Sequence, residues 1–147
     1  MTVFECIRLV SGSRYGDVPE GLVYEQLDTA LAKAGRDQLL VIHGGQRGVD
    51  TIAHSWCIRR GVRVVSIPVL FEARGVEDGK ERNRFLVSAG LIFAAHYKTE
   101  DLLLEAFPGP KSRGTRHCID HARYFNIKTT VTTPDGTRVT YDFRSAQ

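Results

Sequence analysis

The sequence predicts an α/β protein in which a mainly parallel sheet carries helices on both faces and a β-hairpin at one edge. Short apolar and β-branched runs alternate along the chain with longer segments whose apolar residues recur at helical spacing. The last segment instead alternates apolar and polar residues around an Asp-Gly turn. Parallel strands need helical crossovers and bury both faces, so the first pattern favours a parallel sheet and the second an antiparallel edge.

The first half of the chain predicts three strands and two helices. The runs that we interpret as strands are Ile7 to Ser11, Leu39 to His43, and Val62 to Ile67, which ends at Pro68. A helix is expected from about Pro19 to Ala34, because its apolar residues share one face and Gly35 follows. A second helix is expected to begin at Val49, after a glycine-rich turn, with Trp56 among its buried residues.

The next segment predicts a loop, a helix and a strand. After a long polar loop to Gly79, a helix is expected over Lys80 to Ala89, with Phe85 and Leu86 facing inward beside Ala89. The apolar run Leu91 to Ala95 is interpreted as the fourth strand. The residues from Thr99 to Ala106 are interpreted as a polar, partly helical insertion.

The C-terminal part predicts a helix, a fifth strand and the hairpin. The helix is expected over Thr115 to Phe125, and its inward face is Cys118, Ile119, Ala122 and Phe125. The fifth strand begins at Ile127, and the chain turns at Asp135-Gly136 before alternating again through Val139, Tyr141 and Phe143. The hairpin therefore covers about 127–143.

Length and composition predict a single domain over residues 1–147, with no linker or internal repeat. The hydrophobic fraction of 42% and charged fraction of 25% are those of ordinary globular proteins. No apolar run approaches the ~20 residues of a membrane-spanning helix, and Glu5 and Arg8 interrupt any signal peptide, so a cytoplasmic location is expected. The widely spaced Cys6, Cys57 and Cys118 are expected to be buried, reduced thiols.

Three segments that combine glycine with arginine are expected at the carboxyl ends of strands. They are Gly12-Ser13-Arg14, Gly44-Gly45-Gln46-Arg47-Gly48-Val49-Asp50, and Pro108-Gly109-Pro110-Lys111-Ser112-Arg113-Gly114-Thr115. In parallel sheets, ligands bind at this edge, and glycine loops that precede helix N-termini bind phosphate or carboxylate groups. A cationic rim containing Arg14, Arg47, Lys111, Arg113 and Arg116 therefore predicts an anionic ligand.

The glycines match neither common nucleotide fingerprint. Gly44-Gly45-x-x-Gly48 lacks the spacing of the dinucleotide-binding loop, and no Gly-Lys-Ser/Thr end of a P-loop is present. ATP hydrolysis is therefore not expected.

Taken together, these residues resemble the SLOG superfamily of Rossmann-like proteins, in its YspA and YpsA-related branch. The matching residues are Gly12-Ser13-Arg14, Gly44-Gly45-x-Arg47-Gly48-x-Asp50-x-x-Ala53, Pro68, Gly79-x-x-Arg82-Asn83 and Arg113-Gly114-Thr115, which together span Ile7 to Val131. The resemblance implies a Rossmann-like sheet that binds a phosphorylated nucleotide or a nucleotide-derived molecule of the NAD or ADP-ribose type. It leaves open whether the ligand is sensed, sequestered or processed.

Two related groups suggest alternatives. The LOG enzymes hydrolyse the N-glycosidic bond of nucleoside monophosphates with an arginine and the glutamate of a Pro-Gly-Gly-x-Gly-Thr-x-x-Glu motif. Here the motif is altered, and Cys118 stands three residues after Thr115 in place of that glutamate. Gly48 to His54 also resembles a segment of DprA, which binds single-stranded DNA, and the local net charge of 108–128 is positive. Within this segment, Tyr124 is the one aromatic ring that we expect to be exposed.

Several polar residues have both a structural and a functional interpretation. Asp50 and His54 are expected to face each other at a helix start, where Asp50 either caps the helix or orients the imidazole. His117 and His121 share a helical face with Asp120 nearby, but no third metal ligand is evident, so no metal is predicted. Arg82 and Asn83 are either solvated or contact phosphate and ribose.

We therefore expect a site for a nucleotide derivative, with no cofactor and no assigned catalytic residue. The expected ligand-binding residues are Gly12, Ser13, Arg14, Gly44, Gly45, Arg47, Gly48, Asp50, Arg82, Asn83, Arg113, Gly114 and Thr115. The expected partner is this small molecule rather than a membrane. Nucleic acid is a less favoured partner, and self-association through the hairpin is left open.

Overall fold

The computed structural model describes residues 3–67 and 76–143, which form one sheet and its covering helices. The strands are β1 (Cys6–Gly12), β2 (Leu39–His43), β3 (Arg63–Ser66), β4 (Asp101–Phe107), β5 (Lys128–Thr132) and β6 (Arg138–Tyr141). The helices are α1 (Glu20–Ala34), the short 3-10 helix η1 (Arg36–Gln38), α2 (Val49–Arg60), α4 (Val76–Tyr97) and α5 (Arg113–Tyr124).

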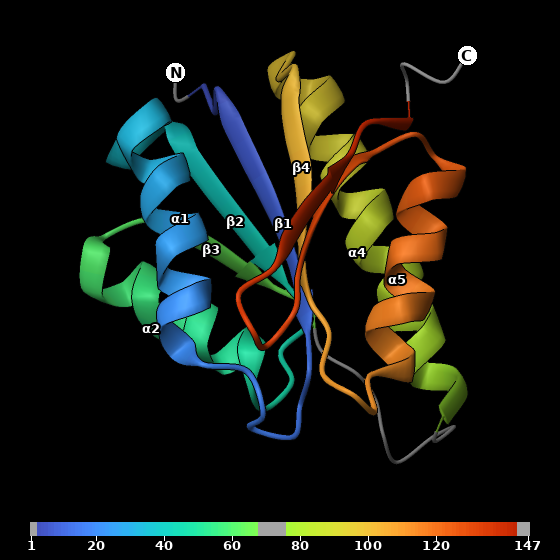
Figure 1. Ribbon diagram of the computed structural model, residues 1–147. Coiled ribbons are helices and arrows are strands. Elements are labelled where there is room, and N and C mark those ends of the chain that lie inside the picture. The colour runs from blue at the N-terminus through green and yellow to red at the C-terminus, as the bar shows by residue number, and fades with distance from the viewer. Residues whose placement is uncertain (1–2, 68–75, 144–147) are drawn as a thin grey trace.

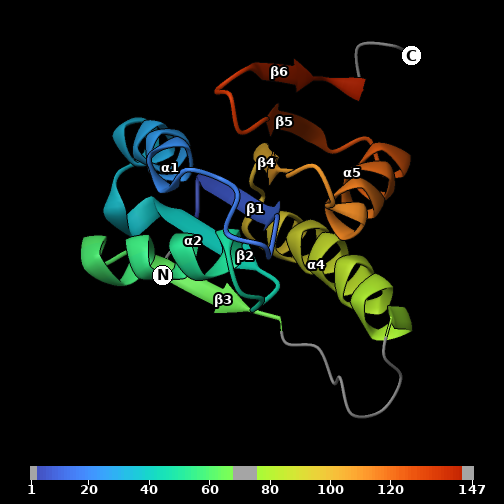
Figure 2. The same ribbon diagram turned by 60° about the horizontal axis from the view of Figure 1, so that its bottom comes forward.

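The six strands lie in the order β3-β2-β1-β4-β5-β6. The first five are parallel, and β6 pairs antiparallel with β5, so the predicted parallel sheet with an edge hairpin is confirmed. The chain moves outward from β1 to β3 and then returns to the other side of β1, where β4 begins the second half of the sheet. Figure 2 shows this order from β3 to β6. The strand order reverses between β1 and β4, where the ligand sites of such sheets lie.

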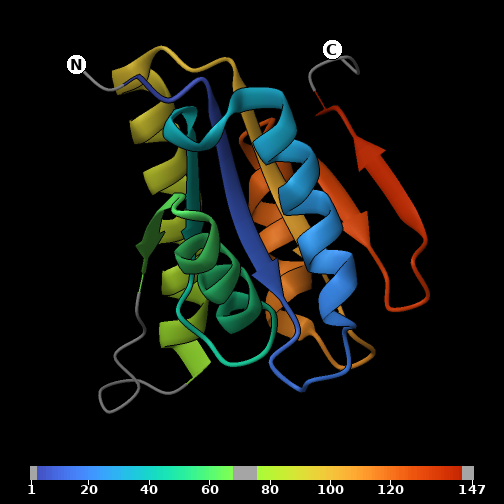
Figure 3. The same cartoon turned by 90° about the vertical axis from the view of Figure 1, so that its left-hand side faces the viewer.

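Two hydrophobic cores fill the space between the sheet and its helices. On the face covered by α1 and α2, Val10, Trp56 and Phe107 are buried in one cluster. On the face covered by α4 and α5, Leu9, Leu86 and other residues form the second. Figures 2 and 3 show the helix pairs on opposite faces of the sheet. The thiols of Cys6, Cys57 and Cys118 are all free and buried within these cores, as predicted.

The predicted fourth strand is wrong, because Leu91 to Ala95 belongs to the long helix α4. Leu91 and Ala94 pack against the core at helical spacing, and Gly90 lies so close to Leu9 that an added Cβ would be 2.8 Å from a Leu9 methyl carbon. A short run in which every residue is apolar fits a buried strand and a helix equally well. Whether Leu91 to Ala95 is a strand or a helix therefore depends on the segment that follows it in the sequence.

The segment that follows is the true strand β4, which begins at Asp101 and takes up all but the first two residues of the partly helical insertion predicted over Thr99 to Ala106. Two carboxylates in β4 interrupt the apolar pattern by which a strand is recognised in the sequence. The guanidinium of Arg8 donates a hydrogen bond of 2.8 Å to Asp101, and the amide of Gln26 donates one of 3.0 Å to Glu105. With these partners, polar side chains are accommodated in a strand that pairs on both sides.

Two predicted inward residues are exposed. Phe85 is 59% exposed and Phe125 is 41% exposed, so both predictions were wrong. Helix α4 starts before the predicted boundary; it buries Leu86, as predicted, together with Val87 rather than Phe85. Phe125 follows the last residue of α5, where the chain leaves the helical face. The predicted loop from Pro68 to Gly79 lies partly outside the described residues, and its last part, 76–79, belongs to α4.

Candidate functional site

The loops that follow β1, β2 and β4 meet at the carboxyl edge of the sheet. In Figure 1 this edge is at the bottom of the view, where the N-termini of α2 and α5 also lie. The backbone amide of Ser13 donates to the carbonyl of Phe107 over 2.9 Å, which joins the ends of β1 and β4. The amide of Val49 donates to the carbonyl of Ser13 over 3.0 Å, which brings the first turn of α2 against the same loop.

Three predicted ligand-contacting glycines are required by the packing of the protein against itself. A Cβ on Gly12 would lie 2.5 Å from the Cβ of Val49, and one on Gly44 would lie 2.8 Å from the Cδ of Arg82. A Cβ on Gly48 would overlap the carbonyl oxygen of Ser13, and the Gly48 φ of +78° is one that L side chains rarely adopt. These glycines therefore position the loops rather than open space for a ligand.

Two other glycines face outward. Gly45 is exposed and has a φ of +72°. Gly114 is exposed in the first turn of α5, and a Cβ there would meet no atom within 4 Å. The side chains of Arg14, Arg47 and Arg113 are exposed around the same edge. The first turn of α5 at Gly114 is thus open, and the exposed guanidinium groups around this edge suit an anionic group.

A buried charged pair lies beneath this surface. Asp50 is 4% exposed, and Arg82 from α4 is 6% exposed. The Oδ2 atom of Asp50 accepts a hydrogen bond of 3.2 Å from the amide of Gln46. When its side-chain oxygen faces Arg82, Gln46 also accepts hydrogen bonds of 2.5 and 3.1 Å from that guanidinium. Gln46, which the sequence did not single out, therefore connects the loop after β2 to both charges.

Asp50 is an unusual carboxyl group. Burial raises its pKa to about 7, against the opposing effects of the Gln46 amide and the Arg82 charge. Its Oδ1 atom has no hydrogen-bond partner among the described residues. A buried carboxylate oxygen without a partner is rare, and this atom is closed to solvent in the structure.

The expected pairing of Asp50 with His54 is not formed, because His54 pairs with His43 instead. The two ring nitrogens, Nε2 of His43 and Nδ1 of His54, are 2.8 Å apart. The amide of Gly45 donates to Nδ1 of His43 over 2.9 Å, so the proton of a neutral His43 ring is on Nε2, and Nε2 donates to His54. Burial, with a smaller effect from His54, lowers the pKa of His43 to about 4. A neutral His43 thus supports the turn at Gly45.

Asn83 joins α4 to the beginning of α5. It is 2% exposed, and its amide nitrogen donates to the carbonyl of Gly114 over 3.0 Å and contacts Nδ1 of His117 at 3.1 Å. Asn83 and Arg82 are therefore not solvated residues at a helix start but buried supports of the loops. Thr115 is also buried, at 3% exposure.

Ser13 stabilises the loop after β1, and Ser112 stabilises the loop after β4. The hydroxyl of Ser13, 2% exposed, donates to the carboxylate of Asp17. The hydroxyl of Ser112 accepts a hydrogen bond of 2.8 Å from the amide of Gly109.

The predicted ligand-binding residues are thus brought to one edge of the sheet, but in two layers. The outer layer is Arg14, Gly45, Arg47, Arg113 and Gly114, and the inner layer is Gly12, Ser13, Gly44, Gly48, Asp50, Arg82, Asn83 and Thr115.

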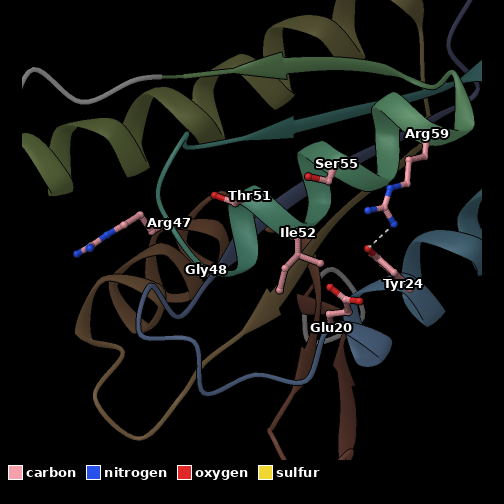
Figure 4. A pocket seen from close by; sticks show the side chains of 8 residues that line it. All are labelled: Glu20, Tyr24, Arg47, Gly48, Thr51, Ile52, Ser55 and Arg59. Atoms are coloured by element: carbon pink, nitrogen blue, oxygen red, sulfur yellow. Dashed lines mark hydrogen bonds between the residues drawn. The ribbon is translucent and has the colours of Figure 1, made fainter.

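A cavity of about 360 Å³ opens beside the site, between α1 and α2. Figure 4 shows that Gly48, Thr51 and Ser55 come from α2 and its N-terminus, while Glu20 and Tyr24 come from α1. The guanidinium of Arg59 donates to the hydroxyl of Tyr24 over 3.4 Å. In the same view, the Arg47 side chain extends away from the other side chains drawn.

The structure offers no metal centre within residues 3–67 and 76–143, where no group of three metal-ligating side chains is found. The rings of His117 and His121 are stacked, with centroids 6.3 Å apart, and His117 is engaged by Asn83. In the described part of the chain, none of the helices is both long and apolar enough to cross a membrane.

The position of the missing glutamate is closed to a ligand. Cys118 is fully buried, and burial raises its thiol pKa to about 12. Asp120 lies on the exposed surface of α5. Neither residue takes the place of the glutamate of the LOG motif.

Comparison with known proteins assigns the family. A sequence profile of the YspA, cpYpsA-related SLOG family matches residues 9–73, from β1 to the end of β3 and beyond. The Gene 61 protein of Mycobacterium phage D29 is 37% identical over 96 residues, which are 60% of this chain and 67% of that protein. The chain belongs to the YspA, cpYpsA-related SLOG family.

The similarity of fold extends beyond the matched segment. The X-ray structure of TM1055, a structural genomics target, superposes with a TM-score of 0.58 at 17% identity, covering 84% of this chain and 72% of that one. This SLOG-family chain therefore shares the α/β architecture of that protein across most of its length. The expected resemblance, stated from the loop residues, is confirmed.

Proposed function

We propose that the protein binds the phosphate of a nucleotide or nucleotide-derived molecule at the carboxyl edge of β1 and β4. The observation that carries the proposal is the outer layer of exposed groups over the reversal of strand order. Arg14, Arg47 and Arg113 are exposed at this edge near the N-termini of α2 and α5, and Gly114 leaves the first turn of α5 open. Membership of the SLOG family supports a nucleotide-related ligand at a general level.

The inner layer gives the site a second, independent feature. Asp50 is buried, but its Oδ1 atom lacks a partner among the described groups. A hydroxyl donor of the ligand, such as a ribose hydroxyl, would complete this bonding once the loop that covers the buried atom opens. A phosphate at the arginines and a hydroxyl at Asp50 together describe a sugar phosphate, which every nucleotide contains.

The test is a thermal-shift titration with AMP, ADP-ribose and NAD at low and high salt. A ligand at about 100 times its Kd raises the midpoint of unfolding by roughly 5–10 °C. Arg47→Ala and Arg113→Ala should each weaken binding about tenfold, since each removes a charged phosphate contact. Arg36→Ala is the matched control, because Arg36 is an exposed arginine that precedes β2 at the opposite edge of the sheet. Unchanged affinity in both site variants contradicts the assignment.

Hydrolysis of the N-glycosidic bond is the second candidate, and Asp50 is the observation that favours it. A carboxyl group with a pKa near 7 exchanges protons readily at neutral pH, as a general acid or base must. If Asp50 serves this role, Asp50→Asn will abolish release of free base from AMP while ligand binding persists. Absence of turnover by the unmodified protein would remove this candidate and leave binding intact.

A further inference from the structure

A groove of about 390 Å³ lies between α5 and the β5–β6 hairpin, away from the glycine loops. Ile119 and Val131 form part of its lining. Arg116 and Arg123 line it from α5, and Tyr141 and Phe143 line it from the hairpin segment. Figure 2 shows α5 beside the open end of the hairpin, where β5 begins and β6 ends. The groove combines aromatic, aliphatic and cationic side chains.

The aromatic side chains of the hairpin form a stack, in which Tyr141 is the exposed ring. The rings of Tyr141 and Phe143 are nearly parallel, with an interplanar angle of 8° and centroids 6.0 Å apart. The guanidinium of Arg123 lies 5.7 Å from the centroid of the Phe143 ring. Tyr141 is 45% exposed, so its ring is available to a ligand. Rings and guanidinium planes of this kind are the groups on which nucleobases stack. The sequence had suggested one exposed ring on α5, and the structure adds the rings of the hairpin.

The charges of the groove select among partners. Arg116 and Arg123 are seven residues apart, which places them on the same face of α5 and about 10 Å apart along its axis. Neither arginine forms an ion pair within the part of the chain that the structure describes, and Asp120 is the one acidic residue of the lining. Two arginines against one aspartate in the lining favour an anionic partner. An aromatic anion satisfies the rings and the charges together.

One end of the groove lies beside residues that are next to the candidate site in the sequence. Pro108, which lines the groove, follows Phe107, and the carbonyl of Phe107 accepts the hydrogen bond from Ser13. Arg116 lies one helical turn after Arg113, which belongs to the outer layer of the site. A ligand that leaves the N-terminus of α5 along this side of the helix therefore enters the groove.

We infer that this groove binds the second ring-bearing unit of a dinucleotide-like ligand, whose first phosphate-bearing unit occupies the glycine loops. The inference rests on the proposed function, because it needs a nucleotide unit at the first site. Its ligand class is a small molecule in which two ring systems are joined through a diphosphate. The exposed ring of Tyr141 stacks with the second ring, and Arg116 attracts the linking phosphates.

The experiment is a calorimetric comparison of NAD with AMP, which is one half of NAD. The full chain is measured with Tyr141→Thr, which keeps a β-branched residue in the edge strand, and with Arg123→Gln. Tyr124→Phe and Tyr124→Ala are the controls, because Tyr124 is 78% exposed on the same helix but does not line the groove. NAD should bind more tightly than AMP, and each groove variant should weaken NAD binding about tenfold without changing AMP binding.

The outcomes separate this inference from the proposed function. Equal affinity for NAD and AMP, or NAD binding that both groove variants leave unchanged, overturns the inference while AMP binding preserves the first site. Failure of both compounds to bind overturns the proposed function and the inference together. If the groove variants instead weaken only a single-stranded DNA whose affinity grows with its length, the groove belongs to nucleic acid and the dinucleotide assignment is wrong.

Discussion

Replacement of Gly48 by alanine tests the claim that glycine is needed for loop packing. Gly48 has φ +78° and ψ −126°, a conformation that costs an L residue about 1–3 kcal/mol. The new Cβ would also overlap the carbonyl oxygen of Ser13 and lie 2.9 Å from the Cα of Arg14. Because these are backbone atoms, the loop must shift, and the hydrogen bond from Val49 to Ser13 is lost at a cost of about 1 kcal/mol.

The free energy of unfolding should therefore fall by about 3 kcal/mol, a substantial part of the roughly 5–15 kcal/mol of a typical domain. Urea denaturation followed by far-UV circular dichroism measures this change, and the m-value should stay the same. Gly21→Ala is the matched control, since Gly21 lies in α1 with nothing within 4 Å of an added Cβ. That variant should be more stable by about 0.5–1 kcal/mol. A loss below about 1 kcal/mol in Gly48→Ala would refute the packing argument.

Three further predictions concern other parts of the molecule. Gly114→Ala should leave the free energy of unfolding unchanged or slightly raised, because a Cβ there meets open space. The same variant should weaken AMP binding if a ligand approaches that amide. Urea denaturation measures the first effect and calorimetry the second. Burial raises the pKa of Asp50 from 3.8 to about 7, so the stability from this group is present below about pH 4 and lost as the pH rises toward 7. The stability of the unmodified protein should therefore fall relative to Asp50→Asn across this range in urea titrations, and a constant difference would contradict the shift. Arg8→Met should lower stability by roughly 3 kcal/mol, because it leaves Asp101 without the guanidinium 2.8 Å away; equal stability would show that Lys33 suffices as its partner.

Local patterns in the sequence determined most of the first half of the fold and the hairpin. β2 follows the predicted boundaries, and α1 lies between the predicted Pro19 and Gly35, because a single face of α1 is apolar and glycine ends it. The hairpin was predicted from strict alternation around Asp135-Gly136, a signal that depends on neighbouring residues alone. The gathering of the glycine and arginine loops at one edge also followed from the sequence, since the carboxyl ends of parallel strands share an edge.

Tertiary structure decided the order of α4 and β4 and the two layers of the site. Leu91 to Ala95 is helical, and Asp101 to Phe107 is the strand beside β1, because Arg8 and Gln26 supply partners for the carboxylates of β4 from elsewhere in the chain. In the same way, Gly12, Gly44 and Gly48 serve packing rather than ligand approach, since the atoms that exclude a side chain come from distant segments. A sequence pattern records the kind of residue at each position, but contacts between distant residues decide whether a buried charge is tolerated and whether a loop faces the ligand or the protein itself.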